Sequence, residues 1–74
     1  MSSPTEAIRE QLMAENPEYQ RLRQEHARYV AQLEHLATRH YLTEQEQMEE
    51  VRLKKLKLRV KDRMEMLVQK ARVA

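Results

Sequence analysis

Residues 43–74 read TEQEQMEEVRLKKLKLRVKDRMEMLVQKARVA, and this stretch decides the fold. It contains neither Gly nor Pro, and it consists mostly of residues that favour helices. Thr43 followed by Glu46 is the pattern of a capping box, in which each side chain accepts a hydrogen bond from the backbone N–H of the other residue. The sequence therefore predicts one long helix over residues 43–73.

Two apolar stripes run along opposite sides of this predicted helix, if successive residues turn by about 100°. The first comprises Leu53, Leu56, Val60, Met64, Leu67 and Ala71. A hairpin partner within the chain would cover it, whereas the second stripe would then face water. We therefore expect the second stripe to be a self-association face. It comprises Met48, Val51, Leu58, Asp62, Met66 and Val73.

A second helix is predicted over residues 17–40, where apolar and aromatic residues alternate at spacings of three and four. This is the heptad pattern of a coiled-coil seam. The connection to residue 43 is so short that the two long helices must be antiparallel neighbours. The seam residues are Tyr19, Leu22, His26, Tyr29, Leu33, Leu36 and His40, facing Leu53, Leu56, Val60, Met64 and Leu67 of the long helix.

A short helix is predicted over residues 3–15, with Ser3 as its cap and Pro4 at its first position. Asn16 and Pro17 then break the chain, because Pro17 disfavours helical geometry at Asn16 and Asn16 can cap the next helix. We expect one all-α domain over residues 1–74, an antiparallel two-helix coiled-coil hairpin preceded by this short helix. The sequence leaves open whether the short helix docks on its own hairpin or on a neighbour's.

The length and composition of the chain narrow the classes of function. Seventy-four residues build only a marginal core, which favours self-association into a dimer or tetramer. Cysteine is absent, and no stretch has the pattern of a signal peptide or a membrane span. We expect a soluble, cytoplasmic protein that is not an enzyme and needs no cofactor, because no nucleophile–base pair, carboxylate dyad or phosphate-binding loop is present.

The histidines are weak candidates for metal binding. His35 and His40 are five residues apart, and a helical zinc site uses a spacing of four. His26 lies in the middle of the seam, where a pH switch or a metal ligand is conceivable. A polar seam residue that sets the register is the simpler interpretation.

Seven basic residues fall within residues 52–63, although the net charge of the chain is only +2. A basic end complements the dipole of a long helix, and facing glutamates could neutralise it. The alternative is that these residues bind the phosphate backbone of RNA or DNA without sequence preference. They are Arg52, Lys54, Lys55, Lys57, Arg59, Lys61 and Arg63.

Several short motifs resemble the YdcH family of small bacterial proteins. They are Glu15-Asn16-Pro17-Glu18-Tyr19, then Glu25-His26, then LKKLKLRVKD over residues 53–62. The resemblance covers roughly residues 8–69; this chain has Tyr19 where Phe is usual, Val60 where Leu is usual and Arg63 where an acidic residue often stands. It implies an antiparallel helical hairpin in the bacterial cytoplasm and supplies no reaction.

The sequence thus favours a structural or interaction protein that contacts itself or a larger protein partner through its helices. Binding of nucleic acid through residues 52–63 is the second hypothesis.

Overall fold

The structure is a computed structural model that describes residues 4–73. It contains three helices, α1 (Pro4–Glu15), α2 (Pro17–Ala37) and α3 (Glu44–Val73), and no strand within the described range. The predicted all-α class is therefore confirmed. The predicted cap at Ser3 lies outside the described residues.

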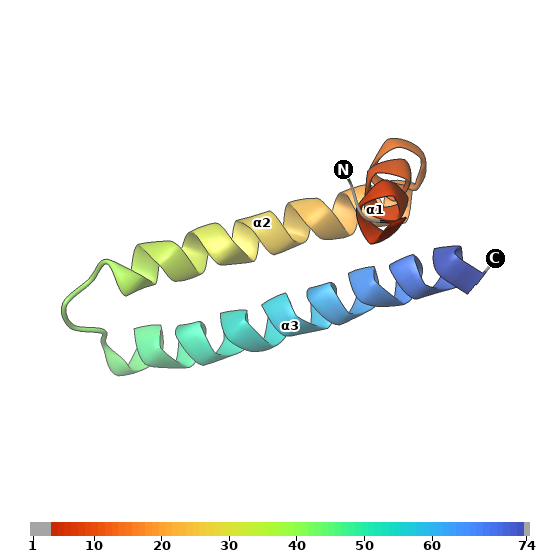
Figure 1. Ribbon diagram of the computed structural model, residues 1–74. Helices are drawn as coiled ribbons and strands as arrows, with labels where there is room; N and C mark the ends of the chain where they lie inside the picture. Colours follow the sequence, from red (N-terminus) through yellow and green to blue (C-terminus); the bar gives the residue numbers. More distant parts are fainter. Residues whose placement is uncertain (1–3, 74) are drawn as a thin grey trace.

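The two long helices, α2 and α3, lie side by side and run in opposite directions (Figure 1). The shorter helix α1 packs at the end of the molecule where α2 begins and α3 ends, and it touches both. The result is a rod with extents of 46 × 22 × 18 Å. One long side of α3 faces α2, and Met48, Val51 and Leu58 on its opposite side are exposed.

The junction between α1 and α2 is a tight corner at Asn16. The backbone N–H of Asn16 donates to the carbonyl of Leu12 at 2.8 Å, and the Asn16 side chain accepts from the backbone N–H of Tyr19 at 3.0 Å. One residue thus ends the first helix and caps the second, with Pro17 in the first turn of α2. The predicted break at Asn16-Pro17 is confirmed, and the corner brings α1 back toward α3.

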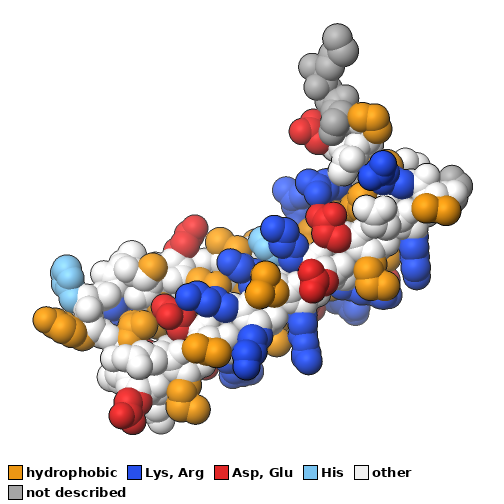
Figure 2. Space-filling view, turned by 60° about the horizontal axis from the view of Figure 1, so that its bottom comes forward, with side chains coloured by type: hydrophobic (Ala, Val, Ile, Leu, Met, Phe, Trp, Pro, Cys, Tyr) orange, Lys and Arg blue, Asp and Glu red, His pale blue; other side chains and the backbone are white. Residues whose placement is uncertain are grey.

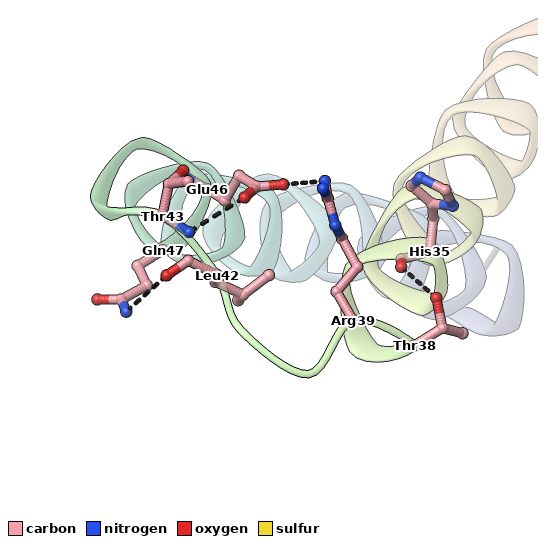
Figure 3. A network of polar contacts seen from close by, with 7 residues as sticks. All are labelled: His35, Thr38, Arg39, Leu42, Thr43, Glu46 and Gln47. Atoms are coloured by element: carbon pink, nitrogen blue, oxygen red, sulfur yellow. Dashed lines mark hydrogen bonds and ion pairs between the residues drawn. The ribbon is translucent and has the colours of Figure 1, made fainter.

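The second helix ends at Ala37, earlier than the predicted end at residue 40. Thr38 turns the chain out of the helix: its backbone N–H donates to Glu34 and His35, and its hydroxyl donates to the His35 carbonyl at 2.7 Å (Figure 3). Such side-chain bonds to the backbone compete with helix continuation. His40, predicted as the last seam residue, therefore lies outside the helix and is exposed.

The predicted capping box at the start of α3 is confirmed. The backbone N–H of Thr43 donates to Glu46 Oε1 at 3.0 Å, and the backbone N–H of Glu46 donates to Thr43 Oγ1 at 3.1 Å (Figure 3). Arg39 forms an ion pair with the same carboxylate across the connection between the helices. The hydrogen bond from the Thr43 backbone, together with the nearby Arg39, lowers the pKa of Glu46.

We predict that Thr43→Ala lowers the free energy of unfolding by about 1 kcal/mol, within the range of about 0.5–2 measured for lost helix caps. The reason is that the backbone N–H of Glu46 loses the hydroxyl that accepts from it. Urea titration followed by circular dichroism checks this value. Thr43→Ser retains the hydroxyl and should stay close to the wild type; an equal loss in both variants would contradict a capping role.

The stabilisation that ionised Glu46 provides should depend on pH. Because folding lowers the pKa of Glu46 from its ordinary value of 4.5, this contribution is complete above that value and is lost as pH falls through the lowered pKa. Glu46→Gln keeps an accepting oxygen but cannot titrate in this range. The stability difference between wild type and this variant should therefore shrink in acid. A difference that is constant from neutral pH into acid would contradict the assignment.

The main core cluster lies at the end of the rod that carries α1. Its buried members are Tyr19, Leu22, Val60, Leu67 and Val68, and Ile8, Leu12, Tyr29 and Met64 pack against them. The short helix thus docks on its own hairpin, a point that the sequence left open. Val68 is only 1% exposed although the seam pattern omits it. Ile8 and Leu12 are four residues apart, so they share one face of α1, and this face packs against the cluster.

Candidate functional site

The most distinctive surface is the side of α3 that faces away from α2, where Figure 2 shows hydrophobic side chains interspersed with Lys and Arg. The predicted self-association residues are all exposed on α3. The large hydrophobic residues of this set are between 50% and 86% exposed. We call this set the outer stripe; it comprises Met48, Val51, Leu58, Asp62, Met66 and Val73. Apolar side chains in a continuous line on a surface indicate a contact with another molecule.

The N-terminal two-thirds of the outer stripe borders a shallow, open groove along α3. Met48, Val51 and Leu58 line it together with four charged side chains, Arg52, Lys55, Arg59 and Asp62. Among the described residues, Arg52 pairs with Glu49, whereas Lys55, Arg59 and Asp62 take part in no ion pair. The groove therefore offers an apolar floor bordered by two unpaired positive charges and one unpaired negative charge.

The predicted seam residues lie between the helices, apart from His40. Buried or half-buried positions alternate along both helices, as expected for side chains that interdigitate. Buried are Tyr19, Leu22, Leu36, Leu53, Val60 and Leu67; half-buried are His26, Tyr29, Leu33, Leu56 and Met64.

The basic stretch of residues 52–63 is partly neutralised by glutamates. Arg63 Nε donates to Glu18 Oε1 at 2.8 Å, which joins α3 to α2. On α3 itself, Arg52 pairs with Glu49 at 3.6 Å and Lys54 with Glu50 at 3.7 Å. Exposed pairs of this kind contribute about 0–1 kcal/mol each. Within residues 4–73, the stretch keeps four basic side chains outside ion pairs, namely Lys55, Lys57, Arg59 and Lys61.

Two arginines from other helices lie beside the basic stretch of residues 52–63 in the folded chain, although they are remote from it in sequence. Arg9 of α1, Arg23 of α2 and Lys61 of α3 line one shallow hollow together with half-buried His26. Arg9 also pairs with Glu65 at 2.9 Å and thereby ties α1 to α3. These residues lie far apart along the chain, so no spacing rule could have grouped them.

Two further findings concern metals and membranes. Over residues 4–73, no group of three or more His, Cys, Asp or Glu side chains is placed to hold a metal ion. In the same range, no helix combines the length and the apolar character that crossing a membrane requires.

Comparison with known proteins places the chain in a family. Residues 20–68 match a family described as a protein of unknown function, DUF465, whose members are small YdcH-like proteins. The matched region contains most of α2, the connection and most of α3, and it begins directly after the Glu15–Tyr19 motif. No curated protein and no solved structure matches the chain. Because the match covers well over half of the sequence, this chain belongs to the YdcH-like family of small helical proteins of unknown function.

Proposed function

We propose that this chain is a non-enzymatic interaction protein of the cytoplasm, an antiparallel coiled-coil hairpin that acts through helix-to-helix contacts. A second copy is the first partner that we expect, and a larger protein partner could use the same surface. The observation that carries the proposal is the outer stripe, whose large apolar side chains are exposed along a single line of α3. Burial of such side chains against a second helix is favourable by about 1.5–3 kcal/mol each.

The small size of the core supports the same proposal. Only seven hydrophobic side chains are buried among residues 4–73, and the members of the main cluster gather at one end of the rod. Small domains of this kind gain stability from oligomerisation, because an interface buries the apolar surface that the monomer leaves in water. The outer stripe extends along most of α3. An interface there would therefore also stabilise the end of the rod near the connection between α2 and α3, where fewer side chains are buried.

Light scattering on a sizing column, at low and at high salt and after removal of nucleic acid, tests the proposal. We expect a mass of at least two chains that persists at high salt, because apolar contacts are not screened by ions. A monomer at every salt and at high protein concentration would overturn self-association.

A second candidate function is binding of the RNA or DNA backbone. The hollow lined by Arg9, Arg23 and Lys61 favours it, because three helices contribute positive charge to one place, although Glu65 also lines the hollow and pairs with Arg9. The paired state of Arg52, Lys54 and Arg63 weakens it, since a bound phosphate would have to compete with glutamates that are already in contact.

Fluorescence anisotropy with a labelled single-stranded RNA and a labelled DNA duplex tests this second candidate. If it holds, affinity falls steeply as salt rises, because phosphate binding releases counterions. Lys57→Glu combined with Lys61→Glu should then abolish binding and leave the mass of the protein unchanged. Absence of binding at low salt would eliminate this candidate.

A further inference from the structure

We propose that two copies of this chain pair through α3 in antiparallel orientation about a two-fold axis, with Lys55 of each copy facing the partner's Asp62. This inference rests on the proposed function, and it adds the orientation, the register and the pair of charges that set them. Three charged side chains border the groove without an ion pair in the described range, Lys55, Arg59 and Asp62, and Lys55 and Asp62 are the two of opposite charge that this register brings together.

Helical geometry places both charges on the same line as the apolar residues. At about 100° per residue, the outer stripe occupies about 80° of the circumference of α3, and Lys55 falls within this arc. The groove lining agrees, since Lys55 and Asp62 border it together with Leu58. A helix that lies in the groove would therefore contact the charged and the apolar residues at once.

The middle of the stripe is symmetric about the point between Leu58 and Arg59, because Val51 and Met66 lie equally far from it, as do Lys55 and Asp62. If a second α3 is laid against it in the opposite direction with this point on the axis, Val51 lies opposite the partner's Met66 and Lys55 opposite the partner's Asp62. Leu58 then lies on the axis beside the partner's Leu58. Val51 thus meets an apolar residue and Lys55 meets a negative charge, and each of these contacts occurs twice in the dimer.

Parallel pairing of the same stripe gives the opposite result. It would place Lys55 against the partner's Lys55 and Asp62 against the partner's Asp62, and like charges that face each other in a seam oppose association. Polar residues at single seam positions are known to set register and orientation in this way. The charge pattern therefore selects the antiparallel arrangement.

The two ends of α3 favour the same orientation. Residues 44–50 contain four glutamates and no basic residue, whereas residues 67–73 contain Lys70 and Arg72 and no acidic residue. Antiparallel pairing brings the acidic end of one helix beside the basic end of the other, and it also places the two helix dipoles head to tail. Parallel pairing would bring like ends together.

Disulfide trapping tests the orientation, since the chain has no cysteine of its own. Val51→Cys and Met66→Cys are made separately, one of them with a mass tag, and are mixed under reducing conditions before oxidation. The antiparallel register predicts a mixed disulfide between the two variants, with at least about ten times less cross-linking in either variant alone. In that register the two copies of position 51 lie about 22 Å apart along the helix axis, too far for a disulfide between them.

Charge reversal tests the register by an independent measurement. Lys55→Glu and Asp62→Lys should each weaken the dimer about tenfold or more, because each creates two facing pairs of like charge. The variant that carries both substitutions restores opposite charges and should return to within about threefold of the wild type. Sedimentation equilibrium gives the three dissociation constants.

The possible outcomes separate the inference from the proposed function. A dimer in which Val51→Cys cross-links to itself would overturn the antiparallel orientation, although the outer stripe would remain the interface. A dimer whose doubly substituted variant stays as weak as the single variants would overturn the facing of Lys55 and Asp62. A monomer in every measurement would overturn self-association itself.

Discussion

Replacing Leu58 by glutamate is expected to convert the self-associated protein into monomers without unfolding it. Leu58 lies at the centre of the outer stripe and is exposed in the single chain, so its loss removes no core contact. In a two-fold dimer both copies of the side chain would be buried, at about 1.5–3 kcal/mol each. The dissociation constant should rise by roughly 10²–10⁴-fold, since about 1.4 kcal/mol corresponds to a factor of ten. Sedimentation equilibrium measures this change.

A control of matched charge separates the apolar contact from a general effect of a new carboxylate. Gln24→Glu adds the same negative charge at an exposed position of α2, away from the outer stripe. It should retain the wild-type mass, and both variants should keep the wild-type helix signal in circular dichroism. If Leu58→Glu keeps the wild-type mass, the outer stripe is not the interface.

The second large effect is expected for Tyr19→Ala, through the stability of the fold. Tyr19 is 2% exposed and lies in the core cluster where α1, α2 and α3 meet. Truncation of a buried aromatic side chain to alanine lowers the free energy of unfolding by about 3–5 kcal/mol. Small domains have only about 5–15 kcal/mol in total, so the variant should be close to unfolding at room temperature. Thermal and urea unfolding followed by circular dichroism measure the loss.

Tyr41→Ala is the matched control, because it makes the same substitution at a position that is 90% exposed. It should leave the midpoint of unfolding nearly unchanged when both proteins are measured at equal concentration. Equal stabilities of the two alanine variants would show that the cluster around Tyr19 does not hold the helices together.

Interactions between residues close in sequence explain where most of the helices begin and end. Thr43 and Glu46 mark the start of α3 because their mutual hydrogen bonds involve only neighbours in the chain. Asn16 marks the corner between α1 and α2 for the same reason. The end of α2 was less predictable. The heptad spacing continues to His40, whereas the helix ends at Ala37, where the Thr38 hydroxyl donates to the His35 carbonyl. A periodic pattern carries no information about such competing bonds.

The sequence by itself determined the all-α class, the corner at Asn16, the family, and the two stripes of α3, because these depend on neighbours and on helical periodicity. Only the tertiary structure decided that α1 packs against the core cluster that contains Val68 and that Arg9 and Arg23 join Lys61. The corner allows α1 many directions, and the one adopted depends on which distant apolar side chains it can bury. The direction of α1 therefore depends on packing between residues that are remote in the chain, and no local sequence pattern predicts such packing.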